Sequence, residues 1–309
     1  MISVVIPVYN EEGSVKKLHE EVVLVMSKIG RPYEIIFVDD GSSDNTVAVL
    51  KGLSPIRIIR FRKNFGQTAA LDAGIKASQG DYIVTLDGDG QNDPAEIPKL
   101  IAELELKDLD VVSGWRKDRQ DSFSKKHASR AAAFLRKFLI NDGIHDSGCT
   151  LKIYRKECFD HVDLYGEMHR FIPAILKIKG FTVGEIVVAH RERGAGTTKY
   201  NWKRGMRGIL DMVSVWFWKK YSNRPLHLFG SVGTVLMTVS LIALGIAFYE
   251  KFVHHIDLSN TAWTMFAMFG FFIGIQMVIS GLMSDIMSKN YFASTRDRSY
   301  LIREEIEKK

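Results

Sequence analysis

The sequence predicts an α/β domain with a largely parallel sheet, followed by a helical part that associates with a membrane. Over residues 2–86, apolar strand-like runs alternate with amphipathic helical segments, which is typical of repeated strand–helix–strand units. Towards the C-terminus, residues 226–249 and 262–284 carry no formal charge. Each of these segments exceeds the roughly 20 residues with which a helix crosses the hydrocarbon core of a bilayer.

The strand predictions follow from short apolar runs. The first run, ISVVIPV at 2–8, is continuous, as expected for a strand that is buried on both faces of a parallel sheet. Further strands are predicted at 33–38, 56–61, 82–86 and 110–116, with helices beginning near residues 15, 46 and 67. A basic helix is predicted at 122–141.

Polar side chains gather where three of these strands end. The first strand is followed by Tyr9 and Glu11, the second by Asp39 and Asp40, and the fourth by Asp87, Gly88 and Asp89. One acid by itself is explained by helix capping or by a turn. Ligands of parallel α/β sheets, however, bind beyond the carboxyl ends of the strands. Acids at three such ends therefore predict a nucleotide diphosphate bridged by a metal.

The segment DGDGQ at 87–91 is the candidate metal site. Side chains two residues apart in an extended chain point the same way, so Asp87 and Asp89 can both reach one cation. Mg²⁺ or Mn²⁺ is commonly held by one or two carboxylates together with substrate phosphates. A polar turn is the alternative for this segment.

Several other functional classes lose support. There is no GxGxxG after the first strand and no GxxxxGK[ST], which disfavours a dinucleotide dehydrogenase and a P-loop NTPase. The net charge of +6 is concentrated beside the apolar segments, which favours anionic lipid over nucleic acid. Cys149 and Cys158 fit no metal-binding spacing and are expected to be free thiols.

Four segments carry a resemblance to a known family. They are PVYNEE at 7–12, DDGSSDNT at 39–46, RKNFG at 62–66 and LDGDGQNDP at 86–94. Together and in this order they resemble glycosyltransferase family 2, which has the Rossmann-like GT-A fold. The C-terminal part narrows the resemblance to polyprenyl-phosphate glycosyltransferases such as dolichol-phosphate mannose synthase and the bactoprenol glucosyltransferases.

The resemblance implies a donor site. Its nucleoside pocket would contain Pro7, Tyr9, Glu11, Val38, Asp39 and Asp40, and its diphosphate and metal site would contain Asp87, Gly88, Asp89 and Gln91. The family pattern makes Asp89 and Gln91 the direct metal ligands, whereas the spacing alone favours Asp87 and Asp89. In the family arrangement Asp87 would instead reach the ribose, and the two assignments stay open.

The resemblance also implies basic residues that would contact the donor and the acceptor. The donor side would include Arg116, Arg170, Arg193 and Lys199, and the acceptor phosphate would contact Arg116, Arg130 and Arg191. Arginine pairs with phosphate through two parallel hydrogen bonds. The segment RGAGTTK at 193–199 resembles the family loop that closes over the donor diphosphate, and closure would exclude water.

The segment HDSGCTLKIYR at 145–155 resembles the region that carries the acceptor-side acid of the family, matching Asp146. With Asp89 and Arg193, Asp146 completes the set expected to act in catalysis. A polyprenyl phosphate has a second pKa of about 6, so its oxygen is mostly ionised at neutral pH. Asp146 would then orient the acceptor or take a residual proton; capping or a turn is its alternative role.

The predicted organisation has four parts. They are a catalytic GT-A domain at 1–200, an amphipathic interfacial helix at 201–225, a transmembrane hairpin at 226–288 with spans at about 226–249 and 262–287, and a basic tail at 289–309. Lysines and arginines flank the hairpin on its outer sides, so the positive-inside rule places both termini and the catalytic domain in the cytoplasm. A core helix is the alternative for the interfacial segment. The GxxxG at 270–274 permits close helix approach within the hairpin or between subunits of a homo-oligomer.

The resemblance implies inverting transfer of one sugar to undecaprenyl or dolichyl phosphate at the cytoplasmic face of the cell membrane. The donor would be a nucleotide diphosphate sugar, with UDP-glucose favoured and GDP-mannose the alternative, and no nucleic acid partner is expected. One rival is a processive polysaccharide synthase, but its QxxRW motif is missing. The other is a catalytically silent nucleotide-binding scaffold, and the intact Asp87, Asp89 and Gln91 argue against it.

Overall fold

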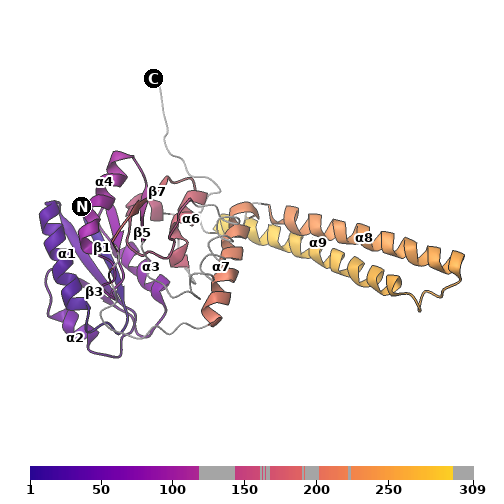
Figure 1. The fold of residues 1–309 in the computed structure, drawn as a ribbon, viewed down its shortest axis with the longest axis horizontal. Helices are drawn as coiled ribbons and strands as arrows, with labels where there is room; N and C mark the ends of the chain where they lie inside the picture. The colour runs from indigo at the N-terminus through magenta and orange to yellow at the C-terminus, as the bar shows by residue number, and fades with distance from the viewer. Residues whose placement is uncertain are drawn as a thin grey trace, which may run out of the picture. The chain divides into compact units, whose positions relative to one another are not determined.

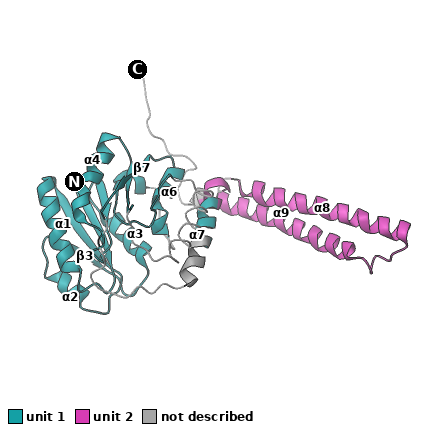
Figure 2. Ribbon diagram, in the orientation of Figure 1, with its two compact units in different colours: residues 1–216 teal, residues 217–309 magenta. Residues whose placement is uncertain are grey.

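The structure is a computed structural model. It describes residues 1–117, 143–160, 162, 164, 168–189, 191, 202–221 and 224–294, without the side chains of 202–209, 211 and 292–294. The chain forms two compact units, Met1–Trp216 and Phe217–Lys309 (Figure 2). The helix predicted at 122–141, which contains Arg130, lies outside the described residues, as do Arg193 and Lys199.

A mixed sheet forms the centre of the first unit (Figure 1). Its described strands are β1 (Ile2–Val8), β2 (Tyr33–Asp39), β3 (Arg57–Arg60), β4 (Tyr82–Thr85), β5 (Val111–Trp115), β6 (Lys152–Arg155) and β7 (Val183–Val187). Their spatial order is β3-β2-β1-β4-β6-β5-β7. Only β6 among these strands runs antiparallel to its neighbours, β4 and β5. The prediction of a largely parallel sheet is therefore confirmed.

Helices cover both faces of the sheet. They are α1 (Val15–Ile29), α2 (Thr46–Lys51), α3 (Gln67–Ala77), α4 (Ile97–Leu106) and α6 (Ile172–Ile178), with single 3₁₀ turns η1 (Pro94–Glu96), η2 (Lys156–Phe159) and η3 (Met168–Arg170). The strands and helices predicted up to residue 116 are present. Strands β6 and β7 were not predicted, because they are short and carry the charged residues Lys152 and Glu185.

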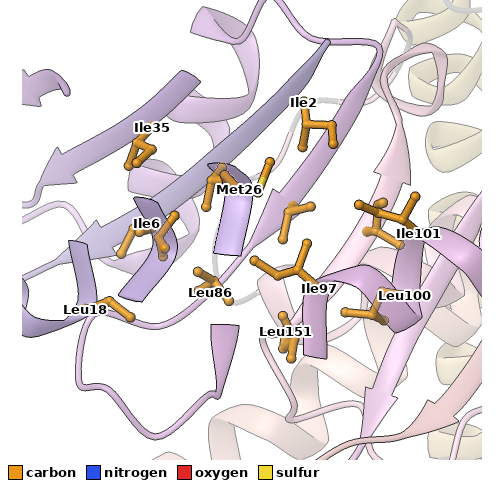
Figure 3. Close-up of a cluster of buried hydrophobic side chains, with 14 of the residues drawn as sticks. Ile2, Ile6, Leu18, Met26, Ile35, Leu86, Ile97, Leu100, Ile101 and Leu151 are labelled. Atoms are coloured by element: carbon orange, nitrogen blue, oxygen red, sulfur yellow. The ribbon is translucent and has the colours of Figure 1, made fainter. Parts of the chain in front are cut away.

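Alternating side chains of β1 enter two separate cores. Ile2, Val4, Ile6 and Val8 face α1 and α4 in the first core, part of which is shown in Figure 3. Val5 faces α3 and α6 in the second core. Because side chains alternate along a strand, the apolar run at 2–8 fills both cores, and all seven of its residues are buried. This packing fixes the sheet edge from which the candidate site extends.

The second unit consists mainly of two long helices, α8 (Pro225–His254) and α9 (Ala262–Ser294). The segments Pro225–His254 and Ala262–Tyr291 are long and apolar enough to cross a membrane, with mean hydropathy of 2.1 and 1.9. In the most apolar 18-residue stretch of each segment, only 22% and 17% of the residues are buried. Such exposure of apolar side chains is typical of helices that face lipid rather than of helices in a protein core. Both predicted spans lie within these helices.

Glycines allow α8 and α9 to approach closely. A Cβ atom on Gly274 would lie 2.6 Å from Cγ of Met237 and 2.8 Å from the carbonyl oxygen of Gly233. A Cβ on Gly270 would meet the hydroxyl of Ser240. Both glycines of the GxxxG therefore face α8, so this motif packs the hairpin against itself. Of the two predicted roles, close approach within the hairpin or between subunits, the structure shows the first.

We expect Gly274→Ala to destabilise the hairpin, because the added methyl group would overlap backbone atoms of α8. Overpacking of this kind costs about 1–3 kcal/mol. Gly245→Ala is the matched control: a Cβ there meets nothing within 4 Å, so it should be neutral or should stabilise α8 by up to about 1 kcal/mol. Thermal unfolding of the purified chain in detergent, followed by helical circular dichroism, measures the difference. Equal unfolding temperatures for the two variants would contradict this packing.

Candidate active site

The loop after β4 lies directly against the end of β1. Parallel pairing of β1 with β4 brings their carboxyl ends to the same edge, and Gly88 then packs against the backbone of β1. A Cβ on Gly88 would lie 2.6 Å from Cγ1 of Val8 and 3.0 Å from the carbonyl oxygen of Pro7. The hydroxyl of Ser14 donates a 2.7 Å hydrogen bond to the carbonyl of Gly88. Glycine at position 88 is thus needed for the contact between the two loops.

The two acids after β2 shape the neighbouring loop. The carboxylate of Asp39 is buried, accepts hydrogen bonds from the Ser42 amide and lies 3.5 Å from Nε of Arg60. The carboxylate of Asp40 accepts hydrogen bonds from the amides of Phe65 and Gly66, at 2.7 and 2.9 Å. Both acids, which the sequence places in a nucleoside pocket, therefore hold the loops that follow β2 and β3.

The other predicted pocket residues differ in exposure. Tyr9 is 46% exposed and can be reached by a ligand. The carboxylate of Glu11 accepts a 3.0 Å hydrogen bond from the Ser14 hydroxyl. The side chain of Val38 is buried in the second core, so only its backbone could contribute to binding.

The candidate metal site combines two carboxylates and an amide on one loop. Asp87 accepts a 2.7 Å hydrogen bond from Nε2 of Gln67, and Asp89 accepts a 3.0 Å hydrogen bond from the amide of Gln91. Burial raises the pKa of Asp87; a hydrogen bond from Thr150 opposes this effect and the charge of Asp89 adds to it. A cation beside these groups would favour their ionised forms.

These ligands suit a particular kind of metal site. Among the described residues there is no group of three His, Cys, Asp or Glu side chains that could hold a metal by themselves. Asp87, Asp89 and Gln91 supply oxygen ligands, but too few for a cage made of protein alone. Mg²⁺ and Mn²⁺ sites in which substrate phosphates complete the coordination have this character. The residues therefore fit a metal that binds together with a phosphorylated substrate.

A buried ion pair joins the exit of β5 to the segment before β6. Nε and Nη2 of Arg116 donate hydrogen bonds to the two carboxylate oxygens of Asp146, at 2.7 and 3.0 Å. The two side chains are only 10% and 13% exposed. Burial alone would raise the pKa of Asp146, but the hydrogen bonds and charge of Arg116 outweigh it, so the pKa is lowered. Asp146 is consequently ionised at neutral pH and is a weak base.

Two residues that the sequence analysis did not single out hold the Asp146 segment. Glu185 of β7 accepts hydrogen bonds from the amides of His145 and Asp146, at 2.9 and 3.1 Å, and lies 2.7 Å from Nδ1 of His145. Lys152 of β6 is buried, and its ammonium group donates to the carbonyls of Ser147 and Cys149. Burial lowers the pKa of Lys152.

The comparison with known proteins decides the family. The family model described as Glycosyl transferase family 2 matches residues 3–163. The chain belongs to glycosyl transferase family 2. The predicted resemblance to this family is confirmed, and the chain is a glycosyltransferase.

Curated relatives extend over nearly the whole glycosyltransferase. The "Dodecaprenyl-phosphate galacturonate synthase" of Rhizobium johnstonii is 38% identical, covering 98% of this chain and 92% of that protein. The "Undecaprenyl-phosphate 4-deoxy-4-formamido-L-arabinose transferase" of Proteus mirabilis is 35% identical, covering 94% of this chain and 89% of that protein.

Solved structures confirm the fold of the glycosyltransferase. Glucosyl-3-phosphoglycerate synthase from Mycobacterium tuberculosis, in complex with UDP, aligns with a TM-score of 0.56 at 17% identity, covering 71% of this chain and 79% of that one. A complex of the same enzyme with Mn²⁺, UDP and glucosyl-3-phosphoglycerate aligns with a TM-score of 0.55. At this identity the likeness establishes the GT-A-like fold.

Arg170, a further predicted site residue of this transferase, is linked through His169 to the start of α3. Arg170 of η3 donates to Nε2 of His169 at 3.4 Å, and Nδ1 of His169 lies 2.8 Å from the hydroxyl of Thr68. Thr68 follows Gln67, the partner of Asp87. These contacts link Arg170 to the start of α3, and its role at the donor diphosphate stays a prediction. Gln67 and Thr68 could not be singled out from the sequence, because neither belongs to a recognisable motif.

The Arg116–Asp146 pair makes a pH-dependent contribution to the stability of this transferase. In the unfolded chain an aspartate has a pKa of about 3.9, and the folded value is lower. The pair therefore stabilises the fold above about pH 4, and this stabilisation is lost as the pH falls through the folded pKa. Because Asp146→Asn leaves a buried arginine without its counterion, we expect it to lower the free energy of unfolding at neutral pH by about 3 kcal/mol.

Thermal unfolding of wild type and Asp146→Asn from neutral to acidic pH tests this expectation. The difference between the two proteins should stay constant down to about pH 5 and decrease only below about pH 4. Asp108→Asn is the control, since the 76% exposed Asp108 forms a surface pair with Arg155, and such pairs contribute little. A difference that already decreases between neutral pH and about pH 5 would contradict the lowered pKa.

Proposed function

We propose that this glycosyltransferase moves one sugar from a nucleotide diphosphate sugar to the phosphate of a polyprenol. The arrangement that carries the proposal is the acidic loop at 87–91, after β4, near the buried Arg116–Asp146 pair, whose Arg116 directly follows β5. Strands β4 and β5 are both antiparallel to β6, so they end at the same edge of the sheet. The names of the relatives from Rhizobium johnstonii and Proteus mirabilis, both aligned over nearly the whole chain, support a polyprenyl phosphate acceptor.

The proposed reaction is a direct displacement at the anomeric carbon. A phosphate oxygen of the acceptor forms the new bond to this carbon while its bond to the donor diphosphate breaks, so the configuration inverts. The acceptor oxygen is largely ionised at neutral pH, and the lowered pKa of Asp146 makes it a poor proton acceptor. We therefore assign Asp146 to orienting: it holds the guanidinium of Arg116, which contacts the acceptor phosphate or the donor.

The remaining assignments follow from the sequence predictions. Asp89 and Gln91, or Asp87 and Asp89, would hold Mg²⁺ or Mn²⁺, which supplies positive charge to the departing diphosphate. Tyr9, Asp39 and Asp40 would form the nucleoside pocket with Pro7, Glu11 and the backbone at Val38. Arg170, Arg193 and Lys199 would contact the donor, and Arg130 the acceptor phosphate.

We propose that α7 (Trp202–Tyr221) lies in the membrane interface. Met212 and Val215 pack on α6 against Phe171 and Ala174. Leu210 and Val213, on the opposite side of the same helix, are 64% and 45% exposed, and Lys219 and Lys220 lie in its last turn. A helix with an exposed apolar face and a basic end is suited to a bilayer surface. The cytoplasmic location of the catalytic domain and both termini, with α8 and α9 as two spans, belongs to the same proposal.

Asp89→Ala should abolish sugar transfer. Loss of this carboxylate removes a proposed metal ligand, and metal stabilisation of a leaving group is worth several kcal/mol, so we expect a decrease of about a hundredfold or more. Asp81→Ala is the matched control, because Asp81 precedes the opposite end of β4 and pairs with the N-terminal amine. Transfer of radiolabelled sugar to undecaprenyl phosphate by the purified proteins is the measurement. Wild-type transfer by a folded Asp89→Ala protein would contradict the mechanism.

The donor is best identified by direct competition. We propose a UDP-sugar and place UDP-galacturonic acid ahead of the UDP-glucose favoured from the sequence, because the relative that is 38% identical is named for galacturonate. The assay offers UDP-galacturonic acid, UDP-glucose, UDP-4-deoxy-4-formamido-L-arabinose and GDP-mannose, and mass spectrometry identifies the lipid product. We expect the highest kcat/KM with galacturonate and a single sugar on each lipid. A higher value for any other donor, or a polymeric product, would contradict this assignment.

A further inference from the structure

The side chain of Arg191 lies between two acids from distant parts of the chain. Its Nη1 donates a 2.6 Å hydrogen bond to Oε2 of Glu21 in α1, and its Nη2 lies 2.8 Å from Oδ1 of Asp93, directly before η1. Nothing in the motifs of the sequence connects Glu21 with Arg191, which lies 170 residues further along the chain. We call this arrangement of Glu21, Arg191 and Asp93 the arginine clasp.

The backbone of Arg191 is bound to the candidate metal loop as well. Its amide donates a 3.0 Å hydrogen bond to the carbonyl of Gln91, and the amide of Gln91 in turn donates to the carboxylate of Asp89. A chain of contacts therefore runs from Glu21 through Arg191 and Gln91 to Asp89. Hydrogen bonds therefore link both of these proposed metal ligands to Arg191.

The clasp is poorly suited to binding a phosphate. Glu21 and Asp93 each place a carboxylate within 2.8 Å of a terminal nitrogen of Arg191, so they offset its positive charge. A phosphate arriving there would meet two negative groups and would have to displace at least one of them. Like charges at such distances disfavour binding. The contacts of Arg191 with Glu21 and Asp93 thus compete with the acceptor-phosphate role that the sequence predicted for it.

We infer that Arg191 is a positioning residue, which with Glu21 and Asp93 fixes the Gln91 loop in the conformation that binds the metal. This inference rests on the proposed function, because it assigns Gln91 and Asp89 to the metal. Its consequence is specific: loosening the clasp should weaken binding of the metal and leave binding of the acceptor unchanged.

Glu21→Gln is the decisive variant, because it removes one charge from the clasp and leaves the guanidinium in place. A partly exposed ion pair contributes up to about 1 kcal/mol, so the Mn²⁺ dissociation constant should increase by about fivefold. The KM for undecaprenyl phosphate should not change. Arg191→Gln should weaken Mn²⁺ binding at least as much, and the double variant should be no weaker than Arg191→Gln, because both changes break the same contact.

Glu105→Gln is the matched control. Glu105 of α4 forms a two-point pair with Arg31, at 2.5 and 3.1 Å, and therefore also joins two separate elements through a partly exposed Arg–Glu contact. Because this pair lies beside the first residue of β4, Tyr82, and not beside Gln91, its loss should leave Mn²⁺ binding unchanged. The control separates the effect of the clasp from a general loss of stability.

The measurement is a Mn²⁺ titration of the purified full-length chain, with and without UDP, in which electron paramagnetic resonance detects the free ion. It requires no sugar transfer. Weaker Mn²⁺ binding by Glu21→Gln supports the clasp even if wild type transfers no sugar in the assay, a result that would reject the proposed function alone. Unchanged Mn²⁺ binding in Glu21→Gln, with a higher acceptor KM in Arg191→Gln, would overturn the inference and make Arg191 a phosphate ligand.

Discussion

Negative charge at one edge of the sheet is the constraint on which the structure of this site depends. Parallel pairing of β1, β2 and β4 brings the acids that follow these strands together, and β5, β6 and β7 add Asp146 and Glu185. Each of these carboxylates accepts at least one hydrogen bond: Asp39 and Asp40 from backbone amides, Asp87 from Gln67, Asp89 from Gln91, Asp146 from Arg116 and Glu185 from the His145 segment. Donors at fixed positions allow acids to stay close before any cation binds.

Regular patterns made the framework of this site predictable. The apolar run at 2–8 predicts a strand buried on both faces because each alternate residue must enter a core, and all seven residues are buried. The ends of β1, β2 and β4 are marked by acids and turn residues, so their convergence follows from the rule for parallel sheets. The length of the two uncharged segments, 226–249 and 262–284, is enough to predict the two long helices.

The residues that hold the site segments in place do so through contacts between distant parts of the chain. Local sequence patterns therefore could not predict them. Strand β6 is only four residues long and is antiparallel, so Lys152 reads as a surface residue although it is buried beneath the Asp146 segment. Glu185 contacts His145 from 40 residues away, and Glu21 contacts Arg191 from 170 residues away. Such pairs have no local signal, since a glutamate on a helix or strand is ordinarily solvated.

The structure also separates two roles that arginine plays beside phosphate substrates. Arg116 forms its pair with one carboxylate through Nε and Nη2, so a guanidinium with five donors keeps capacity for a second anion. Arg191 has both terminal nitrogens against carboxylates, so its single positive charge faces two negative charges. An anionic ligand is recruited by donors that still have capacity for it, whereas an arginine whose two terminal nitrogens both contact carboxylates cannot approach a phosphate without losing one of these contacts. We therefore propose that Arg116 contacts the substrate and that Arg191 supports the protein.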